Sequence, residues 1–221
     1  MEPAEAGFRF ISAGVTIPAT VDYVVETRGS TTLGREGATV GMVEHVLSAL
    51  FGLGVVGATI VVDGPEIPIL DGSALPWAQA TMDASPVSGV PGVPGGCVVS
   101  VELSARGGLD ALGPRTASFD FGSGDYLAEI AWARTFVHAA DVDRLLAQGM
   151  GAGATPENTL VVPAMGDPLP VTRGPSEPAR HKLLDLIGDL ALLGRPLSGS
   201  ISLVDSGHAS HIALVHQLSL S

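Results

Sequence analysis

The fold of this chain is decided by the stretch RHKLLDLIGD at residues 180–189. His181 and Asp185 are four residues apart, so on a helix they project from the same face one turn apart. Asp189 follows one turn later, and most of the other residues are aliphatic, which predicts a largely buried helix. Carboxylates on a buried helix are costly unless something neutralises them, and a divalent metal ion is the simplest candidate. Lys182, the only lysine of the chain, lies beside the proposed ligand.

Two further segments carry the same chemistry. Apolar residues at positions 43, 46, 47, 50 and 51 have helical periodicity, with Glu44 and His45 together off the apolar stripe. The sequence SGHASH at residues 206–211 follows a strand-like run and supplies another histidine, His208. Two histidines and a carboxylate make a plausible catalytic zinc set with one open position. A glutamate beside a ligand and a further histidine supply a base and an acid.

Composition excludes several classes of partner. The 221 residues carry a net charge of −12, which argues against a nucleic-acid phosphate or an anionic membrane as partner. The single cysteine, Cys97, excludes an internal disulfide and fits a reducing compartment. We expect that the acidic residues 1–5 do not form a secretory signal, and that the uncharged run 46–62 is too short and glycine-rich for a membrane span. We therefore expect a cytoplasmic protein.

A Pro/Gly-rich stretch, residues 85–96, reads as a linker and divides the chain into a first domain, 1–84, and a second domain, 97–221. The fold class we predict is α+β, with a β-sheet layered against helices in each domain. Expected strands are 8–11, 20–27, 58–62, 97–103, 117–121, 126–132, 159–162 and 200–204. Expected helices are 43–51, a short one beginning at 75–78, 141–148, 180–193 and 209–218.

A weak internal repeat links the two domains. In each, a histidine early in a helix (His45, His181) is followed by a glycine break, a return strand and then Asp and Gly. Two similar layers facing each other would bring both histidines to a shared interface, which is a natural place for a cleft. The metal site is therefore expected between the domains.

Five motifs, in order along the chain, resemble the UDP-3-O-acyl-N-acetylglucosamine deacetylase family of lipid A biosynthesis. They are VEH at 43–45, EIPILDGSA at 66–74, ARTF at 133–136, HKLLD with GD at 181–189, and SGHA at 206–209. The resemblance implies a zinc-dependent amidase with two similar α+β domains. It implies removal of the N-acetyl group from an acylated UDP-sugar, a small-molecule substrate, with release of acetate.

Carried over residue by residue, the resemblance implies that His45, His181 and Asp185 are the metal ligands. Glu44 matches the general base that activates water. His208 matches a general acid or electrostatic partner, Asp189 the carboxylate that orients it, and Thr135 a donor to the oxyanion. The resemblance also implies three substrate contacts: Lys182 near the phosphate side, and Phe136 and Asp141 along the sugar and acyl pocket.

This sequence differs from the family pattern at two places. The family's longer N-terminal segment, with a Gly-Val-Gly-Leu-His-type motif and two further strands, has no counterpart in this sequence, and the segment 104–125 is short. The insert at about 137–162, which forms an acyl passage in the family, is retained. Its apolar residues could line a channel: Val142, Leu145, Leu146, Met150 and Leu160.

Alternatives remain open at this level. The chain could deacetylate a simpler N-acetylated amino sugar, or bind a sugar nucleotide without catalysis. Fe²⁺ could replace Zn²⁺ in a site of two histidines and an aspartate. The sequence does not fix the acyl-chain length or the oligomeric state. Structural or surface roles are expected for His211, His216 and the turn 70–73, and a place for His138 in the pocket is left open.

Overall fold

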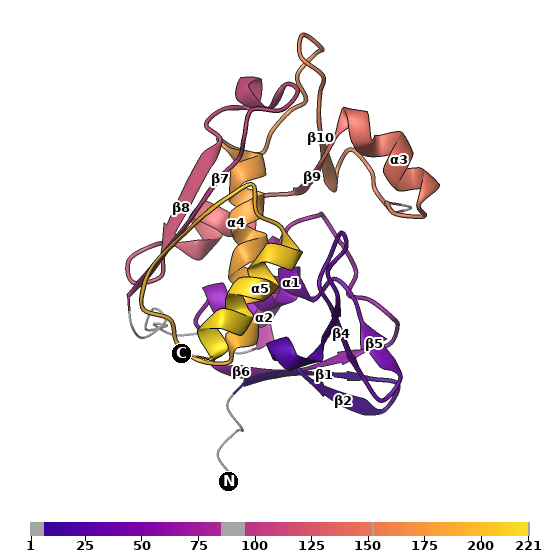
Figure 1. Cartoon of the computed structure of the whole chain (residues 1–221), viewed down its shortest axis with the longest axis vertical. Coiled ribbons are helices and arrows are strands. Elements are labelled where there is room, and N and C mark those ends of the chain that lie inside the picture. Colours follow the sequence, from indigo (N-terminus) through magenta and orange to yellow (C-terminus); the bar gives the residue numbers. More distant parts are fainter. Residues whose placement is uncertain (1–6, 85–95, 152, 221) are drawn as a thin grey trace.

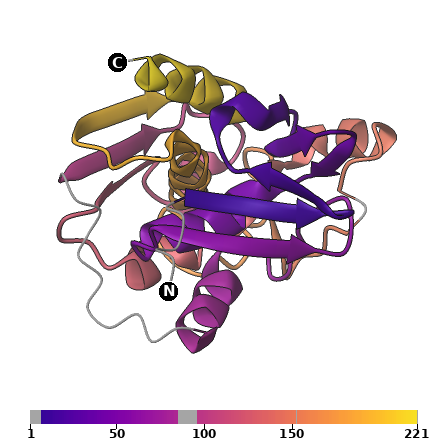
Figure 2. The same ribbon diagram turned by 90° about the horizontal axis from the view of Figure 1, so that it is seen from below.

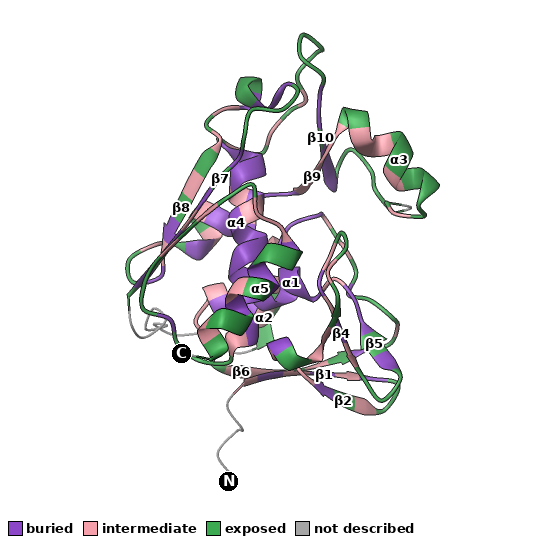
Figure 3. Ribbon diagram, in the orientation of Figure 1, coloured by how far each residue is buried: buried purple, intermediate pink, exposed green. Residues whose placement is uncertain are grey.

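The computed structural model describes residues 7–84, 96–151 and 153–220, and two helices form its centre (Figure 1). Helix α4 (Glu177–Leu190) packs against α1 (Val43–Gly52). Figure 3 shows that α4 is buried along most of its length, with Arg180 and Lys182 only partly covered. The aliphatic pattern of residues 180–189 predicts a largely buried helix, and α4 is buried although it carries several charged residues.

The first domain places a three-stranded sheet against these helices. Its strand order is β2-β1-β6, with β1 (Gly7–Ser12) antiparallel to β2 (Val15–Pro18) and parallel to β6 (Gly57–Val62). Helix α1 lies between β1 and β6 in the sequence, and α2 (Leu75–Ala84) follows the sheet. Figure 2 shows β1 and β6 side by side, with α4 seen nearly end-on.

The second domain repeats this arrangement. Its strand order is β11-β7-β8, with β7 (Cys97–Glu102) antiparallel to β8 (Thr116–Asp120) and parallel to β11 (Gly199–Val204). Helix α4 precedes β11 and α5 (His208–Ser219) follows it. The α+β class with two similar sheet-and-helix domains is thus confirmed. Most of the linker predicted at 85–96 lies outside the described residues.

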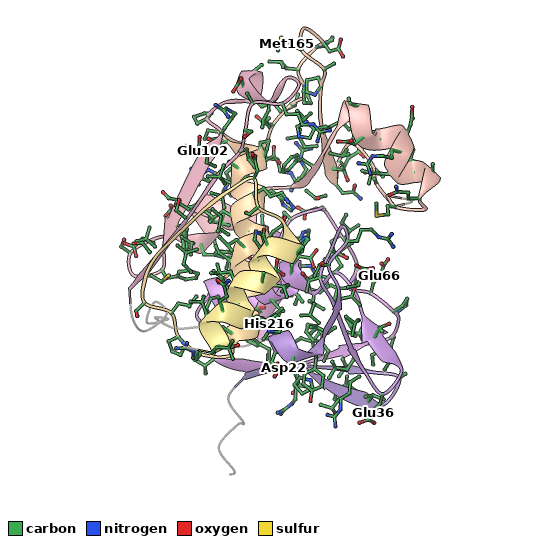
Figure 4. The ribbon with its side chains drawn as sticks, in the orientation of Figure 1. Asp22, Glu36, Glu66, Glu102, Met165 and His216 are labelled. Carbon is green, nitrogen blue, oxygen red and sulfur yellow. The ribbon has the colours of Figure 1, made fainter. Side chains whose placement is uncertain are left out.

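Smaller elements frame the space between the domains. An antiparallel sheet of β3 (Val24–Glu26), β4 (Thr32–Arg35) and β5 (Ala38–Val40) belongs to the first domain. The insert of the second domain contains β9 (Thr135–His138) and β10 (Thr159–Val162), a parallel pair, with α3 (Val142–Ala147) between them. Figure 4 shows Met165, 86% exposed, at the outer end of the loop after β10.

Two strand predictions are wrong. Residues 127–131 form a π-helical turn, because Tyr126 and Ile130, four residues apart, are buried on one face and Asp125 caps the first turn through the Ala128 N–H (3.1 Å). In the segment 20–27, a 3-10 turn at 21–23 leaves only β3 as a strand. Short apolar runs fit either periodicity, so burial decides between them.

The helices α1 and α4 approach closely at Gly188. A Cβ atom there would overlap the backbone carbonyl of Glu44, so only glycine fits. Both helices also start after a residue with left-handed backbone, Met42 (φ 58°) and Ser176 (φ 58°). The close contact brings the first turn of α1 beside the third turn of α4, where the polar residues of both helices lie.

Replacing Gly188 by Ala is expected to destabilise the protein by about 1–3 kcal/mol, because the added methyl group must push α1 away from α4. Helix propensity alone would give the opposite sign, since Ala is about 1 kcal/mol better than Gly inside a helix. Thermal unfolding measures the change. Gly64→Ala is the matched control, because a Cβ atom at Gly64 meets nothing within 4 Å. Equal or higher stability of Gly188→Ala would contradict the close packing.

Candidate active site

A cavity of about 910 Å³ lies between the two domains. Its walls come from α1, α4, β9, α3, the loop before β4 and the N-terminus of α5. Glu66, labelled in Figure 4, is on the first-domain side of this cavity. The cleft expected from the internal repeat is therefore present. Polar side chains of both central helices line it: Glu44, His45, His181, Lys182 and Asp185.

Three potential metal ligands meet in this cavity. His45 on α1 and His181 and Asp185 on α4 are all buried, and their ligand atoms lie within 4.8 Å of one another. Asp185 Oδ1 is 3.3 Å from His181 Nε2 and 3.8 Å from His45 Nε2. Ligand atoms of a tetrahedral zinc site, with bonds of about 2.0–2.2 Å, stand about 3.3–3.6 Å apart. The distance to His181 lies in this range and the distance to His45 slightly above it, so the three atoms are close to the spacing that a divalent metal ion requires.

The protonation states also fit a metal. Burial and the neighbouring His181 lower the pKa of His45 to about 3, and burial lowers the pKa of His181, so both imidazoles are neutral. Burial opposes ionisation of Asp185, but His181 and Lys182 outweigh it and keep the pKa of Asp185 below its usual range. Metal ligands must be deprotonated, and these three are.

Hydrogen bonds hold two of the three potential ligands in place, His181 and Asp185. His181 Nδ1 donates to the carbonyl of Ala133 (3.0 Å), which leaves Nε2 free for a metal. His45 Nδ1 is buried and has no hydrogen-bond partner among the described residues. Lys182 Nζ donates to Asp185 Oδ2 (3.1 Å), the oxygen that does not face the histidines. His181 and Asp185 are thus held by hydrogen bonds to groups outside the ligand set, and all three potential ligands line the cavity.

Glu44 lies beside the ligands with its carboxylate held in place. Although it falls off the apolar stripe of α1, it is only 3% exposed. The Thr31 N–H donates to Glu44 Oε2 (3.0 Å), and Oε1 is 3.7 Å from His208 Nε2. Burial raises the pKa of Glu44 to about 7, the charge of Asp189 acts in the same direction, and His208 opposes both. A carboxyl group with this pKa can accept and return a proton near neutral pH.

His208, at the start of α5, is the cationic partner of this glutamate. Its Nδ1 donates to Asp189 Oδ2 (2.8 Å). Burial disfavours the imidazolium, but Asp189 and Glu44 outweigh burial and raise the pKa of His208 to about 10. His208 is therefore charged at neutral pH, and Asp189 fixes which ring nitrogen points at Glu44.

Thr135, Phe136 and Lys182 line the cavity near the ligands. Thr135 and Phe136 come from β9, and the Phe136 ring is 6.3 Å from the His181 ring. Lys182 Nζ lies 5.8 Å from the centre of the Phe136 ring, a cation–π distance. The structure thus brings together all the predicted site residues except Asp141, with Asp189 behind His208.

Some predicted pocket residues lie elsewhere. The Asp141 carboxylate pairs with Arg106 (2.7 Å) and Arg144 (3.1 Å), and it is not among the residues that line the cavity. Leu160 is 1% exposed and packs in a small core cluster, so it is not a channel residue. His138 is likewise absent from the walls. Val142, Leu145, Leu146 and Met150 do line the cavity, as expected.

Two further buried residues belong to this cluster: Thr31, which the sequence analysis did not single out, and His211, for which it expected a structural or surface role. The Thr31 hydroxyl donates to Asp189 Oδ1 (2.6 Å), while its N–H holds Glu44. His211, expected to be structural, is fully buried; its Nδ1 donates to Asp189 Oδ2 (2.8 Å) and its Nε2 accepts from the Ser206 hydroxyl (2.9 Å). The spacing of His208 and His211, one helical turn apart, was the available signal. Thr31 carries no such signal, because its partners are distant in sequence.

His181→Ala is expected to abolish stoichiometric metal binding, because it removes one of the three potential ligands that meet here among the described residues. Elemental analysis after loading with zinc and desalting measures the metal content per chain. His216→Ala is the control, since His216 lies on the exposed side of α5 (Figure 4). A His181 variant that holds as much metal as the wild type would remove His181 from the ligand set.

The chain is similar to one family of known proteins over nearly all its length. The family model described as LpxC: UDP-3-O-acyl N-acetylglycosamine deacetylase matches residues 1–91 and 90–219. The UDP-3-O-acyl-N-acetylglucosamine deacetylase of Anaeromyxobacter dehalogenans is 41% identical over 98% of this chain and 78% of its own length. Proteins of the same name from Myxococcus xanthus (37%; 92% and 72%) and Thermosynechococcus vestitus (36%; 99% and 85%) are also similar.

Across the described part of the chain, no helix has the length and apolar character that crossing a bilayer requires.

Proposed function

This chain belongs to the UDP-3-O-acyl N-acetylglycosamine deacetylase family, and on that premise we propose that it removes the N-acetyl group from UDP-3-O-acyl-N-acetylglucosamine in lipid A biosynthesis, releasing acetate. One observation carries the proposal: a two-histidine, one-carboxylate set lies beside a buried glutamate and a cationic histidine in one cavity. Together these groups can activate a water molecule, take up its proton and stabilise the oxyanion, which is one way to hydrolyse an amide.

The metal is proposed to be zinc, held by His45, His181 and Asp185, with Fe²⁺ as the alternative that the same ligands accept. When bound, such an ion polarises the acetyl carbonyl and lowers the pKa of water in the site to about 7. The neutral imidazoles and the ionised Asp185 support this assignment, because they can bind a cation without first losing protons.

Glu44 is proposed to take the proton of the attacking water and pass it to the leaving amine. Its raised pKa and its fixed position under the Thr31 N–H support this role. His208, held as an imidazolium by Asp189, stabilises the developing oxyanion or shares in the proton transfer. The Thr135 hydroxyl is a further donor for the oxyanion.

The rest of the cavity suits an acylated UDP-sugar. Lys182 offers a positive charge to the phosphate side, and Phe136 offers an apolar face to the sugar. The apolar wall from α3 and the segment after it, which includes Leu145 and Met150, suits an acyl chain. A non-catalytic descendant would have no need of a buried polar cluster that is costly to maintain. Asp141 remains a proposed contact only if the substrate extends to the Arg106 side of the insert.

Acetate release from UDP-3-O-acyl-N-acetylglucosamine by the zinc-loaded protein tests the proposed reaction. We expect turnover with the loaded protein and its loss after treatment with a chelator, restored by added zinc. No acetate release from either the acylated or the non-acylated UDP-sugar would exclude deacetylation of this substrate class. We propose a cytoplasmic location, which the buried, unpaired Cys97 supports.

A further inference from the structure

The small ribbon that carries Thr135 needs outside support. Among the strands that the structure describes, β9 pairs with β10 alone, and the two make a separate two-stranded sheet. A two-stranded ribbon on its own is at best marginally stable. Yet Thr135 and Phe136 must be held at a fixed distance from the metal ligands on α4 if they act there. Some other contact must fix the start of β9.

That contact is a buried ion pair between the residue before β9 and the first residue of α4. Arg134 is 7% exposed and Glu177 is fully buried. Glu177 Oε1 accepts from the Arg134 side-chain Nε (2.9 Å) and backbone N–H (3.1 Å). Glu177 Oε2 accepts from Arg134 Nη2 (3.2 Å) and from the Arg173 N–H (2.7 Å). The carboxylate thus receives four N–H groups, and the paired fork geometry is specific to arginine.

The guanidinium of Arg134 also fastens the two loops of the insert. Its Nη1 donates to the carbonyl of Pro156 (3.0 Å), just before β10, and its Nη2 donates to the carbonyl of Val171 (2.9 Å), in the loop after it. One side chain therefore connects the residue before β9, the segment before β10 and the first residue of α4. Moving Arg134 would move the ribbon as a whole.

The residues on either side of Arg134 make hydrogen bonds that connect β9 to the proposed metal ligands and to the first domain. The carbonyl of Ala133 accepts from His181 Nδ1 (3.0 Å), and the N–H of Thr135 donates to the carbonyl of Gly72 in the first domain (2.8 Å). Glu177 is also one helical turn ahead of His181 on α4. The ion pair therefore lies between the hydrogen bond that orients a metal ligand and the residue that offers the oxyanion donor.

We propose that Arg134 and Glu177 are positioning residues that set both the orientation of His181 and the position of the Thr135 hydroxyl. Neither touches the reacting atoms, and neither is a ligand. The pair fixes the Ala133 carbonyl, which orients His181 for the metal. It also fixes the backbone of Thr135, whose hydroxyl would contact the transition state. The expected effect of the pair on kcat rests on the proposed deacetylase function. The expected effect on metal affinity does not depend on that function.

Glu177→Gln is the sharpest variant, because it keeps the shape and changes the hydrogen bonding. Each carboxylate oxygen accepts two N–H groups. Whichever way the Gln amide is placed, its NH₂ group faces two other donors. We expect the zinc affinity, measured by competition with a chelator, to weaken about 10–100-fold. We expect kcat to fall at least about 10-fold with KM nearly unchanged, since an oxyanion donor acts in the transition state.

Val99→Ala is the matched control for lost stability, because Val99 is fully buried in β7, outside the insert. If Glu177→Gln loses thermal stability as Val99→Ala does, yet keeps wild-type zinc affinity and kcat, the pair only stabilises the fold and the inference is wrong. Arg134→Lys should behave like Glu177→Gln, since an ammonium group cannot make the paired contact.

A double variant covers the case in which the single variants fail to fold. Arg134→Met with Glu177→Met removes both charges together, which proteins often tolerate. A folded double variant with weakened zinc binding supports the inference, and one with wild-type zinc affinity overturns it. If the wild-type protein itself releases no acetate, the proposed function fails, but the zinc comparison still decides whether the pair positions His181.

Discussion

Glu44→Ala is expected to lower kcat about 10²–10⁴-fold while the protein keeps its metal, because Glu44 supplies a positioned base and not a ligand. The carboxylate is buried and is held by the Thr31 N–H, and burial raises its pKa to about 7, so it can exchange a proton near neutral pH. Steady-state acetate release and elemental analysis on the same preparation measure both effects. His208→Ala should be similarly impaired, also with its metal retained.

Glu66→Ala is the matched control for this experiment, because Glu66 lines the same cavity but is exposed. Its kcat should stay within about a factor of two of the wild type. Near-normal turnover of Glu44→Ala would take Glu44 out of the base role, and loss of metal from it would mean that Glu44 holds the ion as well.

Local spacing made the two central helices predictable from sequence. His181 and Asp185 are one turn apart within an aliphatic run, and both the helix and the buried carboxylate follow from that pattern. The repeat of histidine, helix and return strand predicted the matching β6 and β11. In each of these cases the deciding signal lies within a few residues or recurs at a second place in the chain.

The remaining parts of the site depend on contacts between distant residues. Thr31 and Asp189 are 158 positions apart, and Arg134 and Glu177 are 43 apart, so no local pattern connects them. The strand expected at 126–132 failed because a short apolar run fits both periodicities until its buried face is known. Asp141 was assigned by resemblance to the family. That resemblance matches the residue type, but it could not predict that two arginines pair with the Asp141 carboxylate.

A much higher kcat/KM is expected for UDP-3-O-acyl-N-acetylglucosamine than for UDP-N-acetylglucosamine, by about 10²-fold or more. Residues Val142, Leu145, Leu146 and Met150 give one wall of the cavity an apolar surface. Burying a methylene group contributes about 0.8 kcal/mol, so three or four of them account for a 10²-fold preference. Binding energy from the chain can also orient the reacting amide, so its removal should lower kcat as well as raise KM.

Leu145→Asp and Met150→Asp should reduce this preference without loss of metal, because both side chains line the cavity away from the ligand set. Val161→Asp is the control in the same insert, since Val161 is 40% exposed and does not line the cavity. Equal kcat/KM for the two substrates would contradict a role for the acyl chain and favour a deacetylase of simpler amino sugars. In that case the apolar wall would serve only to pack α3 against the rest of the insert, and the aspartate variants would lower stability and leave the ratio of the two kcat/KM values unchanged.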